Sequence, residues 1–268
     1  MRSAYALIQA SWRTQRSYRV SIILSIVMLG VTVLPVYFVS QALQPYMASS
    51  IATQGKNYFG FLVIGMIALM FVSTTVSSIP DAIGAGIGNG TLEALLATRA
   101  SIPSLLAGMV GYSFIWTAVK AVLFMALALA LGLHLTWSAT LSGILILVLI
   151  VLAHVPFALL AASLVLAFRT TASIPSAVMI ASGLLGGVYW SMSARVIPPW
   201  VQALSNYVPL APGLRALRQT LLEGASLASV MPDVLLLIGF VVMLNALGCL
   251  AFVEALRYAR RTGTLAQY

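Results

Sequence analysis

Long apolar runs alternate with short polar breaks along most of this chain. Each run approaches or exceeds the roughly 20 residues that a helix needs to cross a hydrocarbon core, except the fifth, which is shorter. The expected spans cover residues 20–39, 59–79, 105–131, 141–168, 175–190 and 234–253. Because backbone groups in lipid must be hydrogen-bonded inside the protein, helices are the expected form. The pattern predicts an all-α integral membrane protein with six transmembrane helices, forming a single domain over residues 1–268.

The last third of the chain departs from this regular pattern. The fifth run, from Pro175 to Trp190, contains Gly186 and Gly187, which permit close helix approach or a break. The following segment, 193–231, is too polar and broken to span, yet too apolar for an open loop. It contains one apolar and one amphipathic helix-like run, over residues 200–208 and 213–222.

The first 19 residues form a basic amphipathic segment. Tyr5, Ile8 and Trp12 are spaced to share one helical face, while Arg13 and Arg16 fall on another. This pattern is typical of a helix that lies in the membrane interface. A simple topology anchor is the alternative, and the two readings are compatible.

A helical face is also visible in the polar stretch between the second and third runs. Leu92, Leu95 and Leu96 are spaced at i, i+3 and i+4, so they form a short apolar stripe. Thr91 can cap the first turn, and Glu93 lies where the helix dipole favours an acid. The pattern predicts a small surface helix whose stripe either docks a partner or lies against lipid.

Composition and charge agree with a membrane protein. The chain is 61% hydrophobic and only 7% charged, whereas soluble domains carry about 25% charged residues. In a soluble protein, the net charge of +9 would suggest binding to nucleic acid. Here the basic residues are better explained as loop charges that orient the spans, so no nucleic-acid partner is expected.

The distribution of basic residues predicts that both termini are cytoplasmic. In that orientation, most of the arginines lie inside: Arg2, Arg13, Arg16, Arg19, Arg99, Arg169, Arg257, Arg260 and Arg261. The outer side carries only Lys56, Arg195, Arg215 and Arg218. The positive-inside rule favours this arrangement, which also places the 81–104 connector in the cytoplasm.

The sequence offers no chemistry for an enzyme. The Gly55-Lys56 pair lacks the flanking residues of a G-x-x-x-x-G-K-[ST] nucleotide loop. The single Cys249 and the separated His134 and His154 form no metal-ligand pattern. We expect no catalytic residue, no metal and no cofactor in this chain.

Two motifs resemble one family, the permease subunits of type-2 ABC exporters, which include bacterial drug, lipid and polysaccharide export permeases. The first motif, Gly90-Thr91-Leu92-Glu93-Ala94-Leu95-Leu96-Ala97-Thr98, is similar to the family's G-T-L-E-x-L-L-x-T-P stretch between spans two and three. Arg99 stands where the family prefers proline, so we expect a different exit from this helix.

The second motif lies before the last span, in the outer segment. Its parts are Pro198-Pro199-Trp200, Tyr207-Val208-Pro209-Leu210, Leu214-Arg215-Ala216-Leu217-Arg218 and Glu223-Gly224. They are similar to the family pattern P-x-W/L…N-P-L…R-x-x-L-x-G. The two motifs occur in the right order and on opposite sides of the membrane, so the resemblance covers nearly the whole chain.

The resemblance implies roles for both motifs. Residues 90–102 would form the cytoplasmic coupling helix that docks on a separate ATPase subunit, through Thr91, Leu92, Glu93, Leu95, Leu96, Thr98 and Arg99. The segment 193–231 would form short re-entrant helices that lid the pathway, with Trp200, Tyr207, Pro209, Arg215 and Arg218 as the extracytoplasmic gate. An interfacial segment without a gating role remains the alternative.

The function implied is export of an amphipathic or lipid-linked molecule, such as a drug, lipid or glycolipid. The expected partners are an ABC ATPase subunit, which would bind ATP and Mg, a second copy of the chain or a sister permease, and membrane lipid. The expected location is the cell inner (cytoplasmic) membrane. The alternative is an ATP-independent secondary transporter or channel, with Lys120 as its intramembrane ionisable site.

The polar residues inside the spans suggest either a contact with substrate or a structural role. Lys120 contacts an anionic substrate or headgroup, or it pairs with a neighbouring span or extends its charge toward the membrane surface. For Asn245 and the 73–75 hydroxyl cluster we expect hydrogen bonds between helices.

Overall fold

The structure is a computed structural model that describes residue 9 and residues 19–91, 94, 101–168, 173–192 and 197–262. Regular structure in these residues is entirely helical, as the sequence predicts. The helices are α2 (Arg19–Ile51), α3 (Tyr58–Gly88), α5 (Ile102–Ala130), α6 (Thr140–Phe168), α7 (Ile174–Leu185), α8 (Pro199–Ser205), α9 (Leu210–Glu223) and α10 (Met231–Thr262), with the short 3₁₀ turn η1 (Trp137–Ala139).

Five helices, rather than the expected six, are long and apolar enough to cross a membrane within the described residues. They are α2, α3, α5, α6 and α10. The expected fifth span is helical only over α7, which has 12 residues. At about 1.5 Å per residue, α7 is about 18 Å long, whereas the hydrocarbon core of a membrane is roughly 30 Å thick. The sixth span is therefore not confirmed.

The predicted ends of three spans are wrong. The last span was expected to end at Val253, but α10 continues to Thr262. The second span was expected to stop at Pro80, but α3 continues through this proline to Gly88, because a proline can kink a helix without ending it. The first span was expected to end at Val39, but α2 continues to Ile51. The Gln44 side chain stabilises this extension because it donates to the Lys56 carbonyl at 2.9 Å and accepts from the Tyr58 amide at 2.7 Å.

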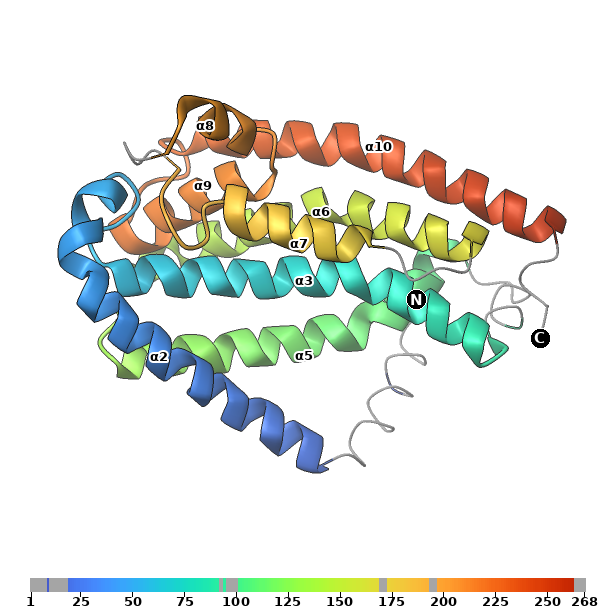
Figure 1. The fold of residues 1–268 in the computed structure, drawn as a ribbon, viewed down its shortest axis with the longest axis horizontal. Helices are drawn as coiled ribbons and strands as arrows, with labels where there is room; N and C mark the ends of the chain where they lie inside the picture. The colour runs from blue at the N-terminus through green and yellow to red at the C-terminus, as the bar shows by residue number, and fades with distance from the viewer. Residues whose placement is uncertain are drawn as a thin grey trace.

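Helix α3 is the centre of the bundle. It packs against α5, α6 and α2, and α10 packs on the outside of α6 (Figure 1). In its apolar window 67% of the residues are buried, against 11% in that of α2. Helix α2 meets α3 at their connecting turn and then diverges from the bundle (Figure 1). The α2–α3 turn, α8 and α9 share one end of the bundle, and the C-terminal end of α3 lies at the other (Figure 1).

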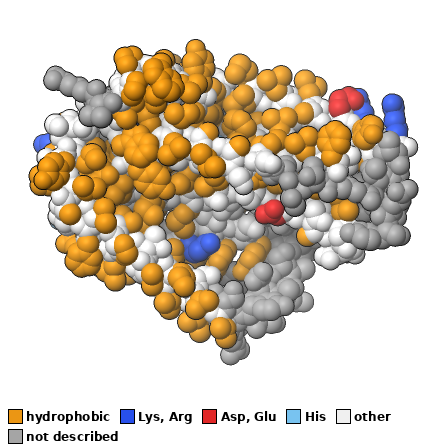
Figure 2. Space-filling view, viewed as in Figure 1, with side chains coloured by type: hydrophobic (Ala, Val, Ile, Leu, Met, Phe, Trp, Pro, Cys, Tyr) orange, Lys and Arg blue, Asp and Glu red, His pale blue; other side chains and the backbone are white. Residues whose placement is uncertain are grey.

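Large apolar side chains cover the outer surface of the bundle. Figure 2 shows them spread over the visible helices, with few charged side chains between them. The exposed large side chains of α2 and α10 are mainly aliphatic, from Val20 to Val39 and from Met231 to Val253. Water would make such a surface costly, whereas a lipid bilayer solvates it, as expected of membrane-spanning helices.

The interfacial helix expected over residues 1–19 lies outside the described residues, apart from Gln9 and Arg19. It stays a prediction.

Candidate functional site

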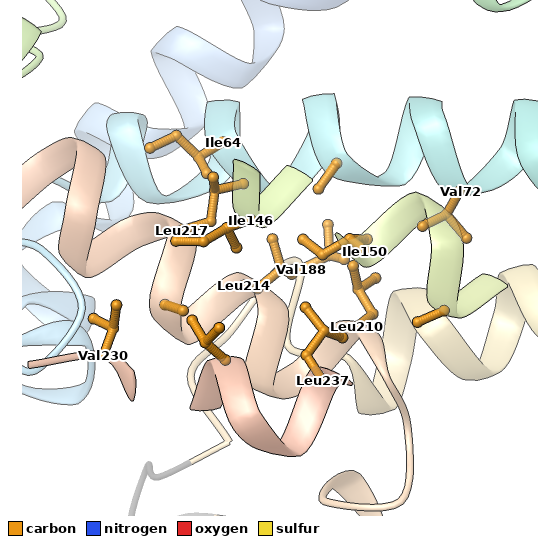
Figure 3. Close-up of a cluster of buried hydrophobic side chains, with 14 of the residues drawn as sticks. Ile64, Val72, Ile146, Ile150, Val188, Leu210, Leu214, Leu217, Val230 and Leu237 are labelled. Carbon is orange, nitrogen blue, oxygen red and sulfur yellow. The ribbon is translucent and has the colours of Figure 1, made fainter. Parts of the chain in front are cut away.

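Helix α9 closes one end of the bundle and forms the base of the candidate site. Leu210, Leu214 and Leu217 lie on one face of α9 and are buried among side chains of α3, α6 and α10 (Figure 3). The polar segment before the last span therefore folds inward, because this leucine stripe packs on the main hydrophobic core. The amphipathic run expected at 213–222 lies within α9.

Arg218 is on the buried side of α9 and is only 1% exposed. Its Nε donates to the Phe61 carbonyl at 3.1 Å, and its Nη2 donates to the Val188 carbonyl at 3.0 Å. Its Nη1 donates to the Gly187 carbonyl at 2.9 Å and to Gln54 Oε1 at 3.3 Å. One guanidinium thus ties α9 to α3, to the α2–α3 turn and to the chain after α7.

The break after α7 explains why Arg218 finds free carbonyls. Gly187 has φ +75°, a left-handed conformation that favours glycine, and it follows Gly186, the C-cap residue of α7. The chain turns there, so the Gly187 and Val188 carbonyls leave the helical ladder and need other donors. The planar five-donor fork of arginine is suited to satisfy several acceptors at once.

Gly65 of α3 makes space for the Arg218 side chain. A Cβ at position 65 would lie 2.6 Å from Arg218 Nη2 and 2.8 Å from the Val188 carbonyl oxygen. Both contacts are closer than packed atoms normally approach, so any larger residue must displace the guanidinium or the turn. Glycine at 65 is thus required by the position of Arg218.

The charge of Arg218 is balanced without a carboxylate. Among the described residues, no acidic oxygen lies within 4.0 Å of its nitrogens. The guanidinium carbon sits 3.3 Å from the centroid of the Phe61 ring, in cation–π geometry. Burial lowers the pKa of Arg218 to about 9, so the guanidinium remains protonated at neutral pH.

Arg215 has a different environment on the same helix. Its Nη2 pairs with Asp233 Oδ1 at 2.7 Å, and its Nη1 donates to Asn206 Oδ1 at 3.3 Å. The two side chains of the pair are 32% and 20% exposed. Arg215 therefore joins α9 to the start of α10 and to the end of α8.

The remaining expected gate residues divide between the core and the surface. Pro209 is buried at the N-cap of α9, whereas Trp200 and Tyr207 are 69% and 76% exposed. A polar cavity of about 200 Å³ lies nearby, and its lining includes Gln54, Arg215 and Arg218. The structure brings the two arginines together at this cavity and leaves the two aromatic residues outside it; their gating role stays a prediction.

Most of the expected coupling residues lie outside the described residues: Leu92, Glu93, Leu95, Leu96, Thr98 and Arg99. Thr91 is described and exposed, and its hydroxyl donates to the Gly86 carbonyl at 3.5 Å. Ala94 is helical and exposed. The docking role of this stretch stays a prediction.

The hydrogen bonds expected between spans are present. Asn245 Nδ2 donates to the Leu152 carbonyl of α6 at 2.9 Å, and the hydroxyls of Thr74 and Thr117 lie 2.7 Å apart across α3 and α5. Lys120 is partly buried one turn beyond Thr117 and lines a second cavity.

Three residues that complete the surroundings of the two arginines were not predicted from the sequence: Gln54, Gly65 and Asp233. The partners of Arg218 are 30 to 164 residues away along the chain, so local patterns carry no signal for them. The burial of Arg218 did have a signal: it lies four residues after Leu214, on the same helical face.

Comparison with known proteins identifies the family. No curated protein matches the chain. The model of the ABC-2 type transporter family matches residues 4–222, which include α2 to α8 and nearly all of α9. This domain is a transmembrane component of ABC transporters and is not itself catalytic. With its apolar helices, the match makes the chain a multi-pass membrane permease. The chain therefore belongs to the ABC-2 type transporter family.

Proposed function

We propose that this chain is the membrane-spanning subunit of an ATP-driven exporter. The observation that carries the proposal is the family match over residues 4–222, because membrane domains of this family normally work with an ABC ATPase. The partner subunit would bind ATP and Mg. The absence of a nucleotide-binding loop from the sequence supports an external source of energy.

The connection between α3 and α5 is the proposed docking site for the ATPase. The C-terminal end of α3, which leads into this connection, lies at the opposite end of the bundle from α9, so one end is available for coupling and the other for release (Figure 1). Its motif, Gly90 to Thr98, is the one that resembles the coupling helix of type-2 exporters. The positive-inside rule supports a cytoplasmic position for this end, with both chain termini on the same side.

Helix α3 is suited to carry force between the two ends. It has 31 residues, so it is about 46 Å long, and it is the most buried of the candidate spans. Its C-terminal end leads into the coupling motif, and Phe61 near its N-terminal end accepts from Arg218. Closure of the ATPase dimer would push on residues 90–102 and shift α2, α3 and α7, opening a pathway between the two permease subunits.

The proposed substrate is amphipathic or lipid-linked and enters from the cytoplasm or the inner leaflet of the cell inner membrane. The largely apolar surface of the bundle supports this choice, because molecules dissolved in the membrane meet α2 and α10 directly. The second permease can be a copy of this chain or a sister subunit.

Copurification tests the proposal. The tagged permease, expressed in its native cells, is expected to retain an ABC ATPase through purification in mild detergent. Export of a lipophilic dye from these cells is expected to stop when ATP is depleted while the membrane potential is held by an external ion gradient. Recovery of no ATPase, together with export that persists without ATP, would refute the exporter and favour the secondary transporter.

A reversible crosslink tests the gating role of residues 193–231. The Gln219 side chain of α9 donates to the Thr53 carbonyl at 3.0 Å, so these positions suit a short crosslinker. In a Cys249→Ser background, Thr53→Cys with Gln219→Cys is expected to lose export after treatment with a cleavable bis-thiol reagent, because α9 can no longer separate from the turn. Cleavage of the linker is expected to restore export.

The single cysteine variants, treated identically, control for modification alone. Full export by the crosslinked double variant would show that the segment is a static cap, and would contradict gating.

A further inference from the structure

A cavity of about 610 Å³ lies between α2, α3, α5 and α7, at the depth of the candidate spans. Its volume is within the range of about 300–1,000 Å³ that is common for small-molecule sites. One wall is formed by the N-terminal half of α2, where this helix diverges from the bundle (Figure 1). The cavity is separate from the polar cavity beside Arg218, and none of its lining residues belongs to α9.

The lining combines a cation, hydroxyl groups and flexible apolar side chains. Lys120 and Thr117 contribute from α5, and Ser73 and Thr74 from α3. Methionines surround this polar part: Met28, Met66, Met70 and Met179. Methionine adapts its shape to different apolar groups, and it is common on surfaces that accept varied ligands.

Lys120 lacks a counter-charge within the described part of the chain. The sequence has five acidic residues; of those described, Asp233 and Glu254 pair with Arg215 and Arg257, and none lies within 4.0 Å of the Lys120 amine. In the same part of the chain the amine has no hydrogen-bond partner. A structural ion pair with a neighbouring span is therefore not what holds this lysine among the described residues.

Snorkelling does not explain Lys120 either. Its Cα lies about 6 Å along α5 from the helix midpoint at position 116, which leaves about 9 Å to the edge of a hydrocarbon core roughly 30 Å thick centred on that midpoint. This distance exceeds the length of a lysine side chain, so the amine stays at the level of the spans. An uncompensated amine at this depth is costly, and it is therefore a mark of a functional contact.

We propose that this cavity binds an acidic amphipath, a molecule with an anionic head and an apolar chain. The Lys120 amine pairs with the anionic head, and the hydroxyls of Ser73 and Thr117 lie beside it. The apolar chain packs against the methionines of α2 and α3. The binding site stands on the cavity and its charge alone; its role as a cargo site rests on the proposed function.

Photolabelling of the purified permease in phosphatidylcholine nanodiscs, without an ATPase, tests the binding. The probes are a sixteen-carbon fatty acid with a diazirine on its chain and the methyl ester of the same molecule. The acid is expected to label the α2 and α3 walls of the cavity about tenfold more than the ester, because a charge-assisted hydrogen bond contributes roughly a factor of ten or more. Mass spectrometry of peptides that contain Met28 or Met70 gives the readout.

Three variants separate the charge of Lys120 from the fold. Lys120→Met is expected to abolish the preference for the acid, and Lys120→Arg to keep it. The matched control is Lys56→Met, because Lys56 is the other lysine of the chain and is exposed in the α2–α3 turn. It removes the same charge and is expected to leave labelling unchanged. Each variant is labelled only as a monodisperse peak in size-exclusion chromatography.

The results decide between binding and its absence. Equal labelling by acid and ester in the unmodified protein, a preference that survives Lys120→Met, or no labelling of the cavity walls would each overturn the proposal. Nanodiscs that contain phosphatidylglycerol identify the source of the anion: competition with the probe assigns the site to an anionic membrane lipid, and its absence to a single-chain acid. Because no ATPase is present, this outcome is independent of the copurification test.

Discussion

Arg218→Met is expected to destabilise the permease by about 3–5 kcal/mol, because several buried acceptors lose their donor together. The acceptors are the carbonyls of Phe61, Gly187 and Val188 and the side chain of Gln54. Methionine fills much of the same space but donates no hydrogen bond. At roughly 2–4 °C per kcal/mol, the apparent unfolding midpoint in detergent should fall by about 10 °C.

Arg218→Lys is expected to give an intermediate midpoint. An ammonium group retains the charge and the cation–π contact with Phe61, but it lacks the planar fork that reaches carbonyls from three segments. If the unfolding midpoint of the Arg218→Met variant lies within a degree of that of the unmodified protein, Arg218 does not anchor α9.

Gly65→Ala tests the same anchor from the opposite helix. The added Cβ would lie 2.6 Å from Arg218 Nη2, so it should displace the guanidinium and lower the midpoint. Gly84→Ala is the matched control on α3, since a Cβ there meets only Val165 Cγ1, at 3.9 Å. Equal unfolding midpoints for the two alanine variants would show that the side chains around Arg218 can rearrange without loss of stability, and would contradict this role of Gly65.

Replacement of Leu92, Glu93 and Leu96 together by alanine is expected to abolish copurification of the ATPase and ATP-dependent export. The apolar stripe would supply the anchor in the ATPase groove, and such central contacts carry most of the affinity of an interface. Insertion should be unaffected, because alanine keeps the helix propensity and the stripe lies between two spans.

The matched control combines two exposed leucines and an exposed glutamate at the other end of the bundle. It replaces Leu141, Leu204 and Glu223 by alanine, and all of these residues are exposed near α8 and α9. The control should retain the ATPase. Equal retention of the ATPase by the Leu92 triple variant would show that the stripe lies against lipid.

Hydrophobic length and turn residues were enough to predict most of the fold. The helical class and the approximate positions of the long spans follow from the requirement that backbone groups be satisfied in lipid. The helices of the outer segment follow from their own periodicity, as α9 illustrates.

The sequence alone does not predict features that depend on contacts between distant segments. Pro80 looks like a helix end, yet α3 continues past it, and Ile83 and Ile87 beyond this proline pack against apolar side chains of α5 and α6. The extension of α2 to Ile51 depends on Gln44, which acts on the first turn of the next helix. The site shows the same limit: the family motif indicated Arg215 and Arg218, but only the fold distinguishes a surface ion pair with Asp233 from a buried anchor.

The position of Arg218 late in the chain has a consequence for biogenesis. Protein synthesis proceeds from the N-terminus, so α2, α3, α5, α6 and α7 leave the ribosome before this arginine does. Until then, Gln54 and the carbonyls after α7 have no guanidinium to bind. The end of the bundle that contains α9 is therefore completed last. A nascent chain stalled before α9 would carry most of its spans in the membrane and still expose an open end to the quality-control machinery.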